Sequence, residues 1–187
     1  IGTKEDPALK YASELGNMIG NTDYTFNALK EELQKIGATI NFFSTGDYFG
    51  LNIKGFDKNF QKTITMAGDF LGTMKVRKED EKKLKKLIQS STLERKFEAR
   101  DASIKGNALR EFALWGQNSS FLTRATTNEV KKMDSDFLME RIANAMNHET
   151  TVFYTGTKEV SEIKSLVGKH LIIKNDLTRS SLSLIHI

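Results

Sequence analysis

The chain has 187 residues, of which 39% are hydrophobic, and a net charge of +4. This length and apolar content are sufficient for a buried core, which excludes an intrinsically disordered chain. The absence of cysteine excludes disulfides and thiolate metal sites, and no apolar run is long enough to span a membrane. The chain begins at Ile1 without Met or a basic, apolar leader, as expected of a mature product or a piece of a longer protein, so the compartment stays open.

Two helices and a β-hairpin are predicted in the N-terminal half. Asp6 is a suitable N-cap and Pro7 suits the first helical position, which predicts a helix that extends to residue 19. A second helix is predicted over residues 25–36, where Gly37 ends it. Residues 38–44 and 48–54 alternate in polarity around a Gly-Asp turn, which predicts a hairpin with one packed face.

The C-terminal half is predicted to be mostly helical. Helices are expected over residues 57–71 (capped by Asp57), 78–100, 101–114, 135–146 and 158–167, a polar loop over 117–127, and strands over 150–155 and 170–173. The apolar side of the 78–100 helix is expected to hold Leu84, Leu87, Ile88, Leu93 and Phe97. Residues 180–187 fit none of these patterns.

These elements define the expected fold class. The hairpin needs antiparallel neighbours, and the helices come in consecutive runs instead of alternating with strands. The sequence therefore predicts an α+β fold, in which an antiparallel or mixed sheet is packed on one face by helices. We expect one domain over residues 1–175 and an irregular tail over 176–187.

The basic residues give little support for nucleic-acid binding. They concentrate between residues 75 and 86, where lysines alternate with Glu79, Asp80 and Glu81 as on the solvated face of a helix. No aromatic stacking platform and no helix-turn-helix pattern accompanies them. We therefore predict no nucleic-acid partner.

One segment of the first helix has a degenerate zinc-peptidase motif. Tyr11-Ala12-Ser13-Glu14-Leu15 stands where an inverted zinc peptidase has His-x-x-Glu-His, in which two histidines one turn apart hold Zn²⁺ and the Glu activates water. Tyr11 and Leu15 cannot replace imidazoles, and the three histidines of the chain are far apart in sequence. Tyr11 and Leu15 are interpreted as an apolar pair on the buried side of the helix, so no catalytic residue and no metal ligand is predicted here.

The order and spacing of four segments resemble the pitrilysin/insulinase family of zinc peptidases. They are residues 2–20 with Gly2-Thr3 and Asp6-Pro7, residues 29–43, residues 94–101, and residues 121–156, which include Thr127, Val130, Met133 and Phe137 and end at Tyr154-Thr155-Gly156. Together they extend over about residues 1–170. No single segment is specific to the family; the resemblance rests on their order.

The resemblance implies roles for individual positions. Glu14 matches the catalytic Glu of the family, and Glu94 lies near the position of the third zinc ligand, whereas Tyr11 and Leu15 occupy both histidine positions. Family enzymes resemble a clamshell of repeated α/β domains, only one of which holds zinc. The resemblance thus implies a domain of this type that lacks zinc and its own catalytic site, with its opening strands missing.

The leading functional hypothesis is a non-catalytic domain that forms a wall of a peptide-binding chamber. Zinc is then expected in a homologous partner domain, in the same polypeptide or another chain, and the substrate is a peptide. The alternative is a scaffolding or assembly subunit that has the fold without a peptidase role. A basic domain that binds nucleic acid is a third hypothesis, which salt-dependent binding would test.

Overall fold

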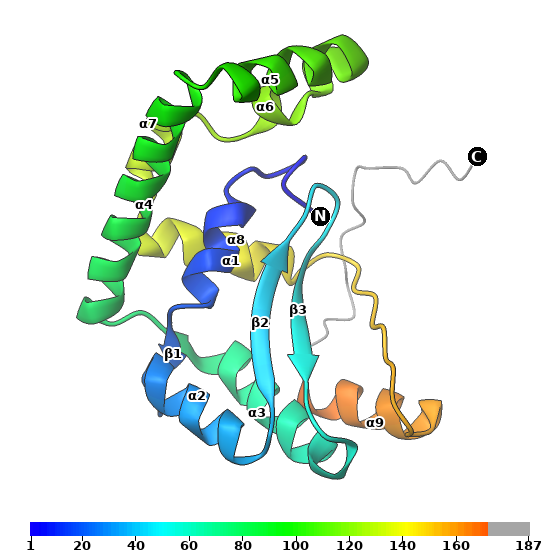
Figure 1. Ribbon diagram of the computed structural model, residues 1–187. Helices are drawn as coiled ribbons and strands as arrows, with labels where there is room; N and C mark the ends of the chain where they lie inside the picture. Colours follow the sequence, from blue (N-terminus) through cyan, green and yellow to red (C-terminus); the bar gives the residue numbers. More distant parts are fainter. Residues whose placement is uncertain (172–187) are drawn as a thin grey trace.

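The computed structural model describes residues 1–171 and consists of helices arranged around a β-hairpin (Figure 1). The helices are α1 (Leu9–Gly16), α2 (Phe26–Lys35), α3 (Phe60–Thr73), α4 (Lys78–Glu98), α5 (Ala102–Trp115), α6 (Ser120–Thr123), α7 (Thr127–Lys132), α8 (Ser135–Ala145) and α9 (Val160–His170), with 3₁₀ turns η1 (Asp57–Asn59) and η2 (Gly116–Asn118). The strands are β1 (Gly20–Asn21), β2 (Thr39–Ser44), β3 (Phe49–Lys54) and β4 (Met74–Lys75).

The hairpin has one packed face and one open face. β2 and β3 are antiparallel, with Ile40 opposite Ile53 and Phe42 opposite Leu51 on the side that faces the helices. The other face presents Asn41 opposite Asn52, and Phe43 opposite Gly50. This alternation places the apolar residues of both strands on the packed face, as the sequence pattern predicts, except for Phe43, which lies on the open face.

The main core lies between the hairpin and helices α1 and α8. α1 packs against both β2 and α8 (Figure 1). Gly16 allows the close approach of α1 to the hairpin, because a Cβ atom at this position would lie 2.4 Å from the ring of Phe42. The buried side chains of α1 and α8 include Leu9, Leu138 and Ile142. Burial of each such side chain contributes roughly 1.5–3 kcal/mol relative to exposure.

Two smaller contacts attach the remaining elements to this core. β1 pairs with β4 antiparallel, with Gly20 opposite Lys75, which connects the segment after α1 to the start of α4. α9 packs on α3. The carboxylate of Asp57 accepts hydrogen bonds from the Tyr154 hydroxyl at 3.1 Å and from the backbone N–H of Thr157 at 3.0 Å, which fastens the segment before α9 to η1.

Helices α4 to α7 form an arm that extends away from the hairpin (Figure 1). α4 packs against α7, whereas α5 contacts only η2 and α6 substantially. α5 has no buried residue, and its side chains Leu109, Leu114 and Trp115 are largely exposed. Residues 1–171 contain no helix that is long and apolar enough to cross a membrane.

The expected α+β class and most element types are confirmed. The Thr25 hydroxyl accepts a hydrogen bond from the Ala28 N–H as the N-cap of α2, and Gly37 follows that helix with a φ of 65°. A left-handed φ of this kind is readily adopted by glycine, which explains why the helix ends there. Asp6 does not cap α1 directly, since its carboxylate accepts from the Ala8 N–H in the turn that precedes the helix.

Several predicted elements are wrong. Residues 150–155 form no strand, because no strand lies beside this segment to pair with it. The segment contacts η1 through a side chain instead, the hydroxyl of Tyr154. The predicted loop over 117–127 contains η2 and α6, and the sequence interpretation missed α7, whose N-cap is Thr126. His170 belongs to α9 instead of a strand, and residues 172–173 of that predicted strand lie outside the described residues, as does the tail over 176–187.

The predicted apolar side of α4 is also partly wrong. Leu84 is buried and Leu87 and Ile88 are half-buried, but Leu93 and Phe97 are exposed. The physical reason is helical geometry: at about 100° per residue, positions 93 and 97 lie roughly opposite position 84. The apolar residues of this helix therefore lie on two faces, of which only one contacts the core.

Candidate functional site

The residues of the degenerate motif in α1 lie in two different environments. Tyr11 is 2% exposed and Leu15 is fully buried, and both belong to the core shared with α8. They are one turn apart and therefore lie on the same face of α1. Glu14 lies on a different part of the helix surface and is half-buried. The two positions that would hold metal-binding imidazoles in the family are thus filled by core side chains.

Glu94 lies close enough to Glu14 for the two carboxylates to interact. Partial burial is the main cause that raises the pKa of Glu14, the nearby charge of Glu94 raises it further, and Lys10 lowers it. Glu94 itself is exposed on α4. The charge of Glu94 therefore acts on Glu14, although the two residues are 80 positions apart in sequence.

These two carboxylates do not constitute a zinc site of the family type. Zinc in proteins is typically held by nitrogen and sulfur ligands, with carboxylates in a supporting role, in sites that have at least three protein ligands. No cluster of three His, Cys, Asp or Glu residues within residues 1–171 could hold a metal. His148 lies beside the Asn144 carbonyl and His170 beside the Thr65 hydroxyl, on other elements, and His186 lies outside the described residues.

The other side of α1 is attached to the edge of β2. The side-chain amide of Asn17 donates to the Phe42 carbonyl at 2.9 Å, and its oxygen accepts from the Phe42 N–H at 2.7 Å. The hydroxyls of Ser13 and Ser44 lie 3.1 Å apart. Asn17 therefore occupies the place that a neighbouring strand would take at Phe42. The sequence interpretation missed this residue, since an Asn just after a helix carries no specific signal of it.

The edge of β3 is unoccupied by other described segments. Phe42 and Leu51 form a pair that is not hydrogen-bonded across the hairpin. Asn17 binds the N–H and C=O groups of Phe42 from outside the hairpin, so the N–H and C=O groups of Leu51 point away from β2 in the same way. By the same alternation, the N–H and C=O groups of Phe49, Leu51 and Ile53 point to the outer edge of β3. No described residue outside β2 makes a hydrogen bond to the backbone of β3. Within residues 1–171, the outer edge of β3 therefore has no pairing strand.

The fold is shared with two solved structures of proteases. One is the ferredoxin protease FusC, solved as a mutant in complex with Arabidopsis ferredoxin; the similarity has a TM-score of 0.75 at 12% identity and covers 96% of the present chain. The other is a protease from Helicobacter pylori, with a TM-score of 0.66 at 12% identity over 98% of the chain. No protein-family model and no curated protein matches the sequence.

The present chain is much shorter than these proteins. It spans 19% of the FusC chain and 45% of the Helicobacter pylori chain. At 12% identity the similarity shows the fold alone. The chain therefore has an architecture that occurs as one part of larger proteases.

Proposed function

We propose that this chain is a non-catalytic domain of a pitrilysin/insulinase-type peptidase. In this proposal it forms one wall of a chamber and binds extended peptide there. One observation carries the proposal: within a fold shared with proteases, Tyr11 and Leu15 fill both metal-ligand positions with buried side chains. The zinc and the activated water then belong to a homologous domain, in the same polypeptide or in a partner chain.

The edge of β3 provides a physical mode of peptide binding. An extended peptide added to a strand edge gains main-chain hydrogen bonds, which give affinity without strong sequence selectivity. The backbone groups of Phe49, Leu51 and Ile53 offer alternating donors and acceptors for such pairing. A peptide bound there would run antiparallel or parallel to β3 and would be held in the extended form that a peptidase needs.

Glu14 alone cannot supply catalysis in this domain. A positioned general base contributes about 10²–10⁴-fold, whereas peptidases of this type rely on zinc to activate the water and polarise the carbonyl. The half-buried Glu14 beside Glu94 retains the carboxylates of such a site without the imidazoles. Hydrolysis is therefore assigned to the partner domain.

A scaffolding or assembly role is the second candidate. The observation that favours it is the exposed apolar surface of the arm, to which Leu109, Leu114 and Trp115 of α5 contribute. Large exposed apolar groups of this kind are typical of surfaces that contact another protein. The two candidates differ in one respect: only the chamber-wall role requires the edge of β3 to bind peptide.

The experiment uses a fluorescent unstructured peptide of about 15 residues and the 187-residue chain. Binding is measured by anisotropy, and cleavage by chromatography with and without a metal chelator. The matched control is the same peptide with N-methyl groups at consecutive residues, which removes donors from both edges of the extended peptide without changing the protein. We expect binding without cleavage, and about tenfold weaker binding of the methylated peptide. Equal binding of both peptides, or chelator-sensitive cleavage, would contradict the proposal.

A further inference from the structure

Several acidic residues of α4 turn toward the body of the protein. Asp80 is 1% exposed and forms an ion pair with Lys83 at 2.8 Å. Glu81 accepts a hydrogen bond from the Ser135 hydroxyl of α8, and Glu98 pairs with Arg124 at 2.7 Å. Of the acidic residues that the sequence places on a solvated face, Asp80 and Glu81 are thus bound within the fold, whereas Glu79 is exposed.

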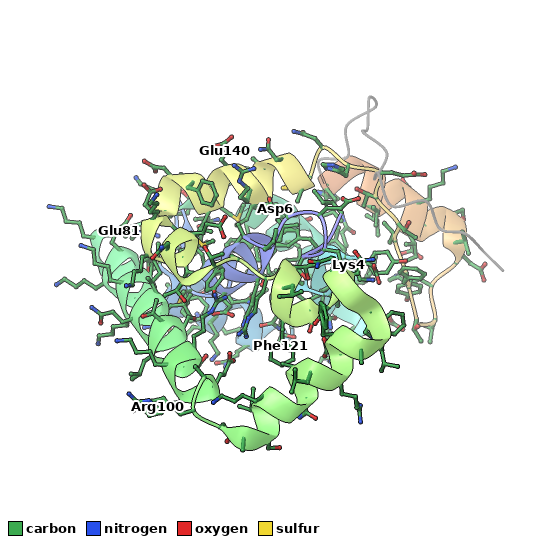
Figure 2. The ribbon with its side chains drawn as sticks, turned by 90° about the horizontal axis from the view of Figure 1, so that it is seen from above. Lys4, Asp6, Glu81, Arg100, Phe121 and Glu140 are labelled. Atoms are coloured by element: carbon green, nitrogen blue, oxygen red, sulfur yellow. The ribbon has the colours of Figure 1, made fainter. Side chains whose placement is uncertain are left out.

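Most of the lysines of the same helix face solvent. Lys82 and Lys86 of α4 are exposed, as is Arg100 in the turn that follows it, and no ion pair joins any of them to another described residue. Lys85 and Lys96 lie beside this row and are also exposed without an ion pair to the described part of the chain. Figure 2 shows nitrogen-tipped side chains that project from α4 away from the body, and Arg100 at the outer corner between α4 and α5. The acidic residue of α4 on this outer side is Glu79, in the first turn.

Two large apolar side chains lie within this cationic row. Leu93 is 52% exposed and Phe97 is 61% exposed. Because positions 82, 86, 93 and 97 are separated by 4, 7 and 4 residues, they share one face of α4, and Arg100 follows in the turn just beyond its last residue. A helix face that contacts only water is typically polar, whereas this face exposes a Leu and a Phe one turn apart. It therefore has the composition of a contact surface.

From this arrangement we propose that the outer face of α4 binds an acidic amphipathic helix of a partner protein. Leu93 and Phe97 would pack against the apolar stripe of the partner helix, and Lys82, Lys86, Lys96 and Arg100 would meet acidic side chains along its flanks. The surface is distinct from the β3 edge, so the inference does not depend on peptide binding there.

The composition of the face favours a helix over other anionic partners. A helix that lies in a membrane interface has an apolar stripe along its whole length, whereas this face has two apolar residues in 21 positions. Binding to phosphate groups depends on cations and gains little from Leu93. A partner helix matches both the apolar pair Leu93 and Phe97 and the cations around it, since ridges of side chains at i and i+4 fit between those of a second helix.

The binding is expected to be weak and sensitive to salt. Two apolar side chains with a cationic surround form a small contact, of the size typical of transient complexes. Charges on the rim of a contact mainly set the association rate and the salt dependence, and salt screens them over about 10 Å at 0.1 M.

The test measures binding of the 187-residue chain to a fluorescent synthetic peptide of about 18 residues, with Leu and Phe on one helical face and Glu on the flanks. A scrambled peptide of the same composition lacks the apolar stripe. The variants are L93S/F97S and K86E/K96E, and the matched control is K30E/K164E, which reverses two exposed lysines on α2 and α9. Circular dichroism melting verifies that each variant is folded, as expected for exposed positions.

We expect each α4 variant to weaken binding of the amphipathic peptide by about tenfold, the control variant to leave it unchanged, and the scrambled peptide to bind about tenfold more weakly. Equal binding of both peptides would overturn the inference, and so would equal losses in the control variant. Anionic phosphatidylglycerol vesicles and single-stranded DNA are measured in parallel. Tighter binding of either one, with the same dependence on Leu93 and Phe97, would assign the face to that partner instead.

Discussion

At the scale of single residues, the burial of Tyr11 and Leu15 decides the part that α1 plays in this chain. Imidazoles at these positions would need a polar, metal-filled environment, whereas here both side chains lie in the core between α1 and α8. A large apolar side chain buried in this way contributes to stability by removing its surface from water. Through these two side chains, α1 supports the fold.

This arrangement predicts that the purified chain binds no stoichiometric zinc. Glu14 and Glu94 offer only carboxylate oxygens, and zinc sites of this type are built on nitrogen ligands. Metal analysis after dialysis against zinc measures the amount of zinc bound per chain. One tightly held zinc per chain that is lost in an E14Q/E94Q double variant would contradict the prediction.

Glu14 also predicts a pH dependence of stability. Its pKa is raised above the ordinary value of 4.5, mainly by partial burial, so the folded state binds the proton more tightly than the unfolded state. Stability from this group is fully present below pH 4.5 and is lost as the pH rises through the folded pKa. Glu14→Gln should thus stabilise the protein near pH 7, by less than about 1 kcal/mol, and the gain should vanish near pH 4.

The measurement is urea unfolding of wild type and E14Q at several pH values, with Glu149→Gln at an exposed position as the control. A gain that grows toward low pH would show that the sign of the argument is wrong.

At the scale of elements, the sequence predicted those that local patterns determine. The hairpin followed from alternation around a Gly-Asp turn, and α2 from Thr25 and Gly37, because these signals act through neighbouring backbone groups. The segment over 150–155 has a strand-like composition but no strand beside it, and pairing depends on tertiary context. Neither the Asn17 contact with Phe42 nor the proximity of Glu14 and Glu94 has a local signal, since both join distant parts of the chain.

Helix α4 provides a direct test of which face contacts the core. Leu84→Ala should destabilise the protein by about 2–5 kcal/mol, because it leaves a cavity in a packed interior. Leu93→Ala should change the free energy of unfolding by no more than about 0.5 kcal/mol, because its side chain is largely exposed. Chemical denaturation measures both, and each variant is the control for the other. A comparable loss at both positions would place Leu93 in the core and contradict the described geometry.

At the scale of the whole molecule, the architecture separates two exposed surfaces. The hairpin presents the edge of β3 and the arm presents the cationic outer face of α4 (Figures 1 and 2), whereas Tyr11 and Leu15 on the core side of α1 are buried. The chain spans only 19% and 45% of the two proteases that share its fold. The proposed peptide-binding edge and the proposed partner-binding face therefore lie on different elements.

The most direct test of the central claim is residue-resolved amide hydrogen exchange in the presence of an unstructured peptide. Binding at the strand edge should protect the amides of Leu51 and Ile53, whose N–H groups point outward, while Asn41 and Asn52 inside the hairpin change little. The peptide should be recovered uncleaved. Protection confined to other elements, no protection at saturating peptide, or recovery of a cleaved peptide would contradict the account of this chain as a non-catalytic peptide-binding wall.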